Sequence, residues 1–473
     1  MGVISNNTDG RINLGFIASR EILPARPEQI AVRYCSSIEA AQMRVLLISG
    51  NRETSGAMTP LPLGLACVAA ATAQAGFEVC FLDLLRTPDW QAATQEAIAT
   101  LRPDVIGLSV RNIDDQTMMN PRFLLQPLQD LIALCRGACR APIVLGGAGF
   151  SIFPESTLAY LGADMGIQGE GETAFPNLLS WLQRGRSGPP PAGVYLAESR
   201  QTHLPMAITG NLDSLPLPTA EAWLSTGLSP EWRIPIQTRR GCARDCAFCS
   251  TGMIEGRQLR WRSAASVVDW LANYRAAGFR NFTSVDNTFN VPLAYAKELC
   301  RKIIDARLDI DWWGQVYPKW VDRELVDLMA RSGCTQVNLG FESGSEPVLQ
   351  LLNKQFTPAE VTEISAMFAA AGVKRNGFLM LGAPGETRQT VEESLAFAES
   401  LHLDALKVSV GIRIYPYTAL AARAIAEGII DRDDDLLFPR FYMVPELRDW
   451  LPERVTGIAF GTPSAVLRPP DAG

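Results

Sequence analysis

Histidine is scarce in this sequence, since the 473 residues include only His203 and His402. A structural zinc site needs four ligands, usually two close pairs of cysteine and histidine side chains. Cys242, Cys246 and Cys249 lie close together, but no fourth cysteine or histidine is near them. The sequence therefore does not predict a zinc site at these cysteines.

The chain also lacks the features that would place it in several other classes. No uninterrupted apolar run is long enough to span a bilayer. Residues 1–42 contain no compact apolar core followed by a small-residue cleavage site. The net charge of -7 argues against a nucleic-acid partner held by phosphate contacts. We therefore expect a cytoplasmic protein with no membrane span and no nucleic-acid partner.

The first half of the chain alternates apolar runs with helical stretches. The predicted strands are residues 45–48, 78–84, 104–110, 142–145 and 163–168, and the predicted helices are 61–75, 123–139 and 172–183. Strands that alternate with helices indicate a parallel sheet covered on both faces. Such sheets bind ligands at the carboxyl ends of their strands. This half is therefore predicted to be a Rossmann-like α/β domain.

A second alternation follows a stretch rich in proline and glycine. Its predicted strands are residues 234–238, 281–286, 311–316, 336–340, 375–381 and 405–410, with helices at 263–277, 292–306, 322–332, 358–371 and 387–401. Six strand–helix units predict a partial (β/α)6 barrel, with its chemistry at the carboxyl ends of the strands. The predicted organisation is an extension (1–42), a first domain (43–185), a linker (186–230), a barrel (231–430) and a tail (431–473).

Cys242, Cys246 and Cys249 follow the first strand of the second half at Cys-x3-Cys-x2-Cys spacing. Cysteine thiolates, usually four, hold iron–sulfur clusters. Three cysteines within eight residues can wrap one cubane and leave its fourth iron open to a small molecule. Disulfide frameworks belong to small secreted chains, so a disulfide here is not expected. Most of the other seven cysteines are predicted to be small buried hydrophobes, which favours a reducing compartment.

The cysteine spacing, with Phe248 before the last cysteine, resembles the signature of the radical S-adenosylmethionine (SAM) family. The resemblance implies that Cys242, Cys246 and Cys249 bind a [4Fe–4S] cluster and that the SAM amino and carboxyl groups chelate the open iron. An electron from the cluster would then cleave SAM to a 5′-deoxyadenosyl radical. A flavodoxin- or ferredoxin-type reductant is the partner expected for such a cluster.

Asp286 and Asn287 end the second predicted strand of the barrel. Members of this family place polar groups for the SAM amino end at that position. The alternative is that both side chains only cap the following turn.

Two further strand ends are similar to family motifs. Gly340, Glu342 and Ser343 resemble a Gly-x-Glu-Ser-Gly segment, whose carboxylate would suit a ribose hydroxyl. Gly382 and Pro384 resemble a Gly-x-Pro-Gly-Glu-Thr turn, where adenine could approach the backbone. The structural alternatives are helix capping by Ser343 or Ser345 and a tight turn before a helix.

The first domain has two glycine-rich segments after its later strands. Gly146 and Gly147 would let a bulky ligand lie against the backbone. Gly169 and Glu170 belong to a Gly-Glu-Gly-Glu segment that is similar to cobalamin-binding proteins. Residues 43–450 as a whole resemble radical SAM proteins with an N-terminal cobalamin-binding domain, of the magnesium-protoporphyrin cyclase and tryptophan-methylase type. The resemblance implies cobalamin as a third cofactor.

Some cobalamin proteins ligate cobalt through the histidine of an Asp-x-His-x-x-Gly loop. This chain differs from them, because it has no histidine before residue 203. The loop after the third strand begins at Ser109, and Arg111 is our candidate for a non-ligating group under the cobalt. A cation there would disfavour a further cobalt ligand. The alternative is that Arg111 pairs with Asp114 or Asp115 in an ordinary surface turn.

This resemblance implies a methyltransferase that acts on an unactivated carbon of a small molecule or peptide. One SAM would methylate the cobalamin, and a second SAM would generate the radical that activates the substrate. A cyclase, ring contractase, dehydrogenase or deoxygenase would use the same two cofactor sites. A non-catalytic iron–sulfur or cobalamin sensor is the alternative from another class, although a sensor needs no SAM pocket.

Overall fold

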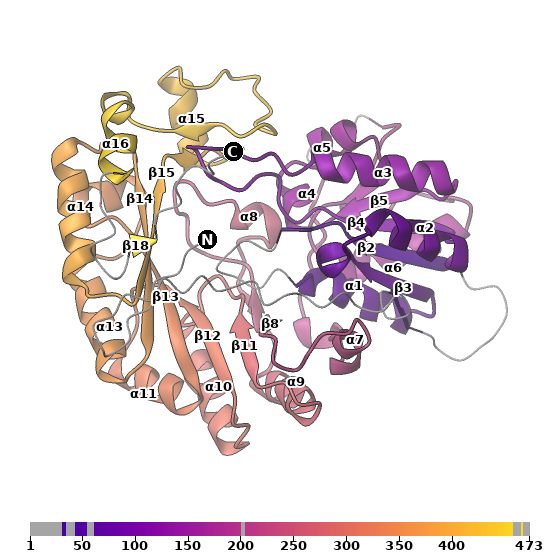
Figure 1. The fold of residues 1–473 in the computed structure, drawn as a ribbon, viewed down its shortest axis with the longest axis horizontal. Helices are drawn as coiled ribbons and strands as arrows, with labels where there is room; N and C mark the ends of the chain where they lie inside the picture. The colour runs from indigo at the N-terminus through magenta and orange to yellow at the C-terminus, as the bar shows by residue number, and fades with distance from the viewer. Residues whose placement is uncertain (1–30, 35–42, 54–60, 200–203, 457–464, 467–473) are drawn as a thin grey trace.

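The computed structural model describes residues 31–34, 43–53, 61–199, 204–456 and 465–466. These residues form two α/β domains that lie side by side (Figure 1). Most of the predicted extension, residues 1–42, lies outside the described residues. Of the helices in the described ranges, the longest have 13 residues, and none is long and apolar enough to cross a membrane.

The first sheet has seven strands in the order β1-β3-β2-β4-β5-β6-β7. Five are parallel: β2 (Arg44–Ser49), β3 (Glu78–Asp83), β4 (Val105–Ser109), β5 (Ile143–Gly146) and β6 (Met165–Ile167). They confirm the predicted strands of this half. The antiparallel edge strands β1 (Ala31–Tyr34) and β7 (Val194–Leu196) lie in stretches that were predicted as extension and linker.

Alternate residues of β2 point to opposite faces of this sheet, and each face has its own apolar core. Val45 and Leu47 pack beneath α1 (Leu63–Gln74) and α6 (Gly171–Gln183). The other face carries Leu46 and Ile48 and is covered by the remaining helices of the domain. These are α2 (Trp90–Leu101), α3 (Gln126–Ala138), α4 (Ala148–Ile152) and α5 (Pro154–Leu161). The strand order reverses between β2 and β4, which is where such sheets bind ligands.

The second sheet is parallel and forms the predicted partial barrel. Its strands run in the order β18-β15-β14-β13-β12-β11-β8. They are β8 (Ile234–Ile236), β11 (Asn281–Ser284), β12 (Asp311–Val316), β13 (Cys334–Glu342), β14 (Lys374–Leu381), β15 (Ala405–Val410) and β18 (Ala465–Val466). The strands from β8 to β15 confirm the six that the sequence predicted, and β18 adds a further strand at the edge.

Five helices follow the barrel strands and lie outside the sheet (Figure 1). They are α9 (Ala264–Ala276), α10 (Leu293–Asp305), α11 (Arg323–Arg331), α13 (Pro358–Ala370) and α14 (Arg388–Ser400). The sequence pattern did not show α7 (Ala220–Leu224), α12 (Glu346–Leu351), α15 (Ala419–Ala426) or α16 (Trp450–Thr456). It also did not show two short antiparallel hairpins. The first pairs β9 (Arg239–Arg240) with β10 (Arg260–Trp261), and the second pairs β16 (Ile412–Arg413) with β17 (Phe441–Tyr442).

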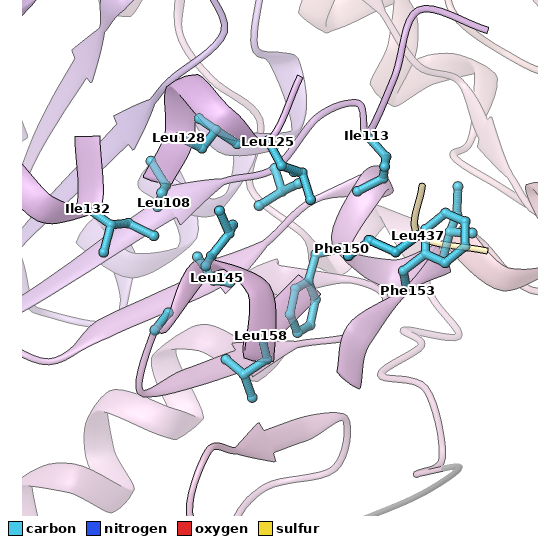
Figure 2. Packing of buried hydrophobic residues seen from close by; sticks show 14 of the residues in the cluster. Leu108, Ile113, Leu125, Leu128, Ile132, Leu145, Phe150, Phe153, Leu158 and Leu437 are labelled. Atoms are coloured by element: carbon cyan, nitrogen blue, oxygen red, sulfur yellow. The ribbon is translucent and has the colours of Figure 1, made fainter. Parts of the chain in front are cut away.

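The two domains share an apolar core. Figure 2 shows part of it, where Leu437 from the C-terminal part packs beside Phe153 of the first domain. Phe438 stacks on Phe123, with ring centroids 4.7 Å apart. A buried ion pair, Asp114 with Arg413 at 2.8 Å, also joins the two domains. The C-terminal segment therefore holds the first domain against the barrel.

Candidate functional site

The three predicted cluster cysteines lie on a loop that leaves the hairpin strand β9 and ends at α8 (Thr251–Ile254). Cys242 and Cys246 are half-buried, and Cys249 is exposed. Gly241 starts the loop at a φ of +84°, a conformation that L side chains rarely adopt. The Cys242 amide donates to the carbonyl of Gly256 at 3.2 Å. The local backbone therefore closes the cysteine loop at its base.

A segment after α12 supports the loop from the barrel side. The Ala247 amide donates to the carbonyl of Leu352 at 3.0 Å. The Asn353 amide group donates to the carbonyl of Asp245 at 2.5 Å. Arg244 donates to the Gln355 side chain at 2.6 Å. Residues more than 100 positions away thus hold the loop in place.

The three thiols lie on one loop, where they could serve as ligands of an iron–sulfur cluster. Among the described residues, no group of three or more His, Cys, Asp or Glu side chains converges on one metal position. In a cubane each thiolate binds a different iron, so convergence on one point is not required. Burial raises the pKa of both the Cys242 and the Cys246 thiol. Arg244 partly offsets this rise for Cys242, and Lys354 partly offsets it for Cys246.

Asp286 lies beneath the start of the hairpin that carries the cysteine loop. Its carboxylate accepts hydrogen bonds from the Thr238 amide at 2.7 Å, the Thr238 hydroxyl at 2.6 Å and the Arg239 amide at 3.1 Å. The Ser284 hydroxyl donates to the same carboxylate at 2.9 Å. These bonds tie Asp286 to the hairpin and not to the turn that follows it, so they do not show the capping alternative, and its predicted contact with SAM stays a prediction.

Asn287 lies next to the third cysteine. The Cys249 thiol donates to the Thr251 hydroxyl at 3.2 Å, and this hydroxyl donates to Asn287 Oδ1 at 3.4 Å. Asn287 Nδ2 donates to the Glu255 carboxylate at 2.7 Å. Polar side chains therefore connect Cys249 with the buried Glu255. Burial raises the pKa of Glu255.

Phe248, Gly340 and Glu342 come together beside Cys246. Glu342 has a φ of +62° and pairs with Lys354 at 3.2 Å. The Lys354 ammonium lies 5.0 Å from the centroid of the Phe248 ring. A Cβ at Gly340 would lie 3.0 Å from Glu342 Oε1, so a larger residue there would crowd the carboxylate. Three predicted site residues from two distant segments are thus neighbours.

Ser343, which follows Glu342 in the same motif, lies in a buried turn before α12. The Ser343 hydroxyl bonds to that of Ser394 at 3.0 Å and accepts the amide of Ser345 at 3.1 Å. The side chain of Ser345 does not cap α12, so the capping alternative for this residue is wrong.

Gly382 has a φ of +96°, and its amide donates to the Glu386 carboxylate at 2.5 Å. The Ala383 amide donates to the same oxygen at 2.8 Å. Pro384 lies in the same turn and is buried. Burial raises the pKa of Glu386 to about 7, against the effect of these two amides. A carboxyl group is thus part of the turn where the sequence predicted that adenine approaches the backbone.

The structure brings together all the first-domain residues that were predicted to bind a cofactor. They line one cavity of about 370 Å³ at the carboxyl ends of β2, β4, β5 and β6. These residues are Ser109, Arg111, Gly146, Gly147, Gly169 and Glu170. Gly147 has a φ of +101°, and a Cβ there would lie 2.7 Å from the Val110 carbonyl oxygen. The edge is therefore open because side chains are absent.

Arg111 does not pair with Asp114 or Asp115, so the surface-turn alternative is wrong. Asp114 pairs with Arg413 at 2.8 Å, and Asp115 pairs with Arg122 at 3.2 Å. Within the described ranges, the Arg111 guanidinium has no ion pair. Burial lowers the pKa of Arg111, and the charge of Asp83 opposes this. Arg111 therefore offers an unpaired cation to the cavity.

Residues of the barrel form the opposite wall of the cavity, and sequence reasoning missed them. They are Pro235, Gln237, Arg240, Ile254, Glu255 and Val285. Arg240 stands two positions before Cys242, and Glu172 is the second acid of the Gly-Glu-Gly-Glu segment. The sequence signal for these wall residues was the charge of Arg240 near the cysteine motif and of Glu172 in the glycine-rich segment. The order of residues in the chain did not show that these two charges lie in contact.

Glu170 and Glu172 of the first domain pair with Arg240 and Arg260 of the barrel hairpin. Glu172 accepts from Arg240 at 2.5 Å, and Glu170 accepts from Arg260 at 2.5 Å. Glu170 Oε2 accepts the Thr209 amide at 2.7 Å. Both oxygens of Glu170 are therefore already bonded within the protein. Its predicted contact with a cofactor stays a prediction.

Apolar side chains such as Leu61, Val68 and Phe175 line the cavity together with glycines, and these surfaces fit a largely apolar cofactor. Charged groups of both domains complete the lining, and no imidazole of the described residues belongs to it. His402 precedes β15, at the opposite end of the barrel strands, and His203 lies outside the described residues. A corrinoid held here would receive no nitrogen ligand from a histidine of the described chain.

Comparisons with known proteins match the two halves separately. Residues 55–179 match the B12 binding domain, and residues 236–398 match the radical SAM superfamily. The tryptophan 2-C-methyltransferase of Streptomyces laurentii is 26% identical over 77% of this chain and 72% of its own length. The anaerobic magnesium-protoporphyrin IX monomethyl ester cyclase of Rubrivivax gelatinosus is 24% identical over 76% of this chain and 66% of its own.

One solved structure has the same fold over most of both chains. It is the radical S-adenosylmethionine methyltransferase TsrM of Kitasatospora setae, with cobalamin and a [4Fe–4S] cluster bound. Its TM-score is 0.75 at 24% identity, and the match covers 86% of this chain and 85% of that chain. The arrangement of an N-terminal B12-type domain beside a partial barrel is thus shared.

Proposed function

We propose that this protein, a radical SAM enzyme whose chain joins a B12-binding domain to a radical SAM domain, methylates a carbon atom of its substrate. The observation that carries the proposal is the shared cavity. One wall is the carboxyl edge of the first sheet, and the other includes Arg240 and Glu255, which flank the cysteine loop. A group carried in the cavity would therefore lie close to chemistry initiated at the cysteines.

In this proposal Cys242, Cys246 and Cys249 hold a [4Fe–4S] cluster, which would supply the electron that cleaves SAM. Asn287 is linked to Cys249 through Thr251, and Glu342 pairs with Lys354, whose ammonium lies over the Phe248 ring. These two residues would orient SAM, and the turn at Gly382 would lie against its adenine. A flavodoxin- or ferredoxin-type protein would reduce the cluster.

The first domain would hold cobalamin as the carrier of the methyl group. Gly146 and Gly147 let the ligand approach the backbone, and Arg111 would face the cobalt without ligating it. A guanidinium is always protonated at neutral pH and is a poor metal ligand. Arg111 would therefore keep the lower face of cobalt free of a nitrogen ligand.

The second candidate is a reaction that does not methylate. It is favoured by the similarity to the anaerobic magnesium-protoporphyrin IX monomethyl ester cyclase. The matches to a tryptophan 2-C-methyltransferase and to the fold of TsrM support methylation instead. The fate of the SAM methyl group distinguishes the two candidates.

The test uses anaerobically reconstituted full-length protein with hydroxocobalamin, a one-electron reductant and SAM that carries a labelled methyl group. Small-molecule and peptide fractions of the source organism supply the substrate. We expect S-adenosylhomocysteine, 5′-deoxyadenosine and a product with the label on carbon, measured by mass spectrometry. Substrate-dependent 5′-deoxyadenosine without any transfer of label would rule out the methyltransferase and leave the second candidate.

A further inference from the structure

Four buried charges lie where the first domain meets the cysteine hairpin. Glu170, Glu172, Arg240 and Arg260 form this cluster, which we call the domain quartet, and each side chain is at most 9% exposed. Arg240 contacts both acids, at 2.5 Å to Glu172 and 3.7 Å to Glu170. The quartet is thus one connected network and not two separate pairs.

The quartet joins the two edges that the proposed chemistry needs. Glu170 and Glu172 stand at the start of α6, directly after β6, and both line the cavity. Arg240 and Arg260 occupy paired positions on β9 and β10, the hairpin that carries the cysteine loop. Arg240 is two positions from Cys242. A shift of this network would move the cavity wall and the cysteine loop relative to one another.

We propose that the domain quartet consists of positioning residues, which set the distance and angle between the cobalamin cavity and the cysteine loop. The inference rests on the proposed function. Charged hydrogen bonds between guanidinium and carboxylate groups are directional, whereas an apolar contact tolerates sliding. Misplacement by about 1 Å can reduce a reaction rate by about 100-fold, so such precision matters for a transfer between two cofactor sites.

Electrostatics of the quartet agree with a rigid contact. Burial raises the pKa of Glu172, but the charge and hydrogen bonds of Arg240 outweigh burial and lower that pKa overall. Glu172 therefore stays ionised over the neutral range. Removing one partner would leave the other charge buried and uncompensated.

Asp114 and Arg413 provide a matched control within the same molecule. This pair also joins the two domains, at 2.8 Å, and its side chains are 1% and 3% exposed. Neither residue lines the cavity, and neither lies on the cysteine hairpin. If buried ion pairs only stabilise the domain contact, Asp114→Asn and Glu172→Gln should have the same consequences.

The first measurement is the distance between cob(II)alamin and the reduced cluster, by pulsed dipolar electron paramagnetic resonance on the holoenzyme. We expect one narrow distance distribution for the wild type and for Asp114→Asn. Glu172→Gln should broaden or shift it. The ratio of methylated product to cleaved SAM should fall by about 100-fold in Glu172→Gln. The same ratio should remain near the wild-type value in Asp114→Asn.

The second measurement needs no cofactor. Amide hydrogen exchange of residues 239–262 should become about tenfold faster in Glu172→Gln but not in Asp114→Asn, which corresponds to about 1.4 kcal/mol of lost local stability. If wild-type protein binds no hydroxocobalamin, the proposed function fails, yet the exchange comparison still tests whether the quartet holds the hairpin.

A reciprocal exchange separates positioning from simple loss of charge. Glu170→Arg combined with Arg260→Glu should restore exchange rates towards wild type, while each single change should not. If Glu172→Gln does not fold, Arg260→Lys takes its place, because lysine keeps the charge and loses the planar donor geometry. Equal distances and exchange rates in the quartet variant and in Asp114→Asn would overturn the proposal.

Discussion

At the carboxyl edge of the first sheet, β4 and β5 end in Ser109 and Gly146, and Gly147 follows with no room for a Cβ. At the carboxyl edge of the barrel, β13 ends in Glu342, paired with a buried lysine, and β14 leads into the Glu386 turn. Both edges belong to parallel sheets covered by helices. The first is open because side chains are missing, whereas the second is filled with polar groups that bond to one another.

This difference reflects what each edge has to hold. A large preformed cofactor needs space and backbone approach, which small residues provide. A cysteine loop has little regular structure of its own, so its backbone groups need partners from elsewhere in the fold. The Leu352 carbonyl, the Asn353 side chain and the Gly256 carbonyl supply such partners for Ala247, Asp245 and Cys242. Substitutions at the two edges should therefore impair different properties: cluster assembly and stability at the barrel edge, and cobalamin binding and methyl transfer at the edge of the first sheet.

The largest effect is expected at the cysteine loop of the barrel edge. Replacing Cys242, Cys246 and Cys249 together with Ala should abolish the visible absorbance of the reconstituted cluster, because no other described cysteine lies in the loop. Cys67→Ala is the control, since this buried thiol should affect stability only. A full cluster in the triple variant would remove the basis of the proposed radical chemistry.

The next effect concerns the buried carboxyl of the barrel edge. Burial raises the pKa of Glu386 from its usual 4.5 to about 7. Between these pH values the folded protein binds a proton that the unfolded chain has released, so this group's contribution to stability falls as pH rises. The loss is up to about 3 kcal/mol. The stability of wild type relative to Glu386→Gln, from urea unfolding at pH 5 to 8, should decrease with pH, and a pH-independent difference would contradict this.

Gly147, which follows β5 at the open edge, should tolerate no side chain. Gly147→Ala places a methyl group 2.7 Å from the Val110 carbonyl at a φ of +101°, so we expect unfolding stability to fall by about 2 kcal/mol. Hydroxocobalamin binding, followed by its visible spectrum, should weaken as well. Gly162→Ala has a positive φ of 64° but free space around the methyl group, so it should leave binding unchanged. Equal binding by both variants would show that the close approach at Gly147 is not needed.

The smallest effect is expected for the unpaired cation of the open edge. Arg111→Ala should slow methyl transfer about tenfold, which is about 1.4 kcal/mol, and leave SAM cleavage nearly unchanged. Arg122→Ala, which removes a guanidinium paired with Asp115, is the control and should alter neither step. The wild-type cob(II)alamin spectrum should lack nitrogen splitting on its axial lines. Such splitting would exclude our assignment for the lower face of cobalt.

Local patterns were sufficient for the central strands of both sheets and for the longer helices that the sequence analysis named, but not for the shorter elements. Apolar runs such as residues 45–48 predicted strands buried on both faces, and the structure confirms them. The spacing of Cys242, Cys246 and Cys249 is likewise local, so the motif was visible without a fold. The hairpin of β9 and β10 was not visible, because its two strands have only two residues each and its pairing depends on contacts across the loop.

The sequence by itself determined two parallel α/β domains, because strand and helix periods are properties of neighbouring residues. It also determined the cysteine loop and the glycines of the open edge. Only the tertiary structure decided which charges meet. Glu170 and Glu172 are 70 and 68 positions before Arg240, and they pair because α6 and the cysteine hairpin face one another across the domain boundary. Among the described residues Arg111 has no ion-pair partner, because Arg413 and Arg122 pair with Asp114 and Asp115. Ion pairs depend on distance in space, and chain order carries no record of that distance.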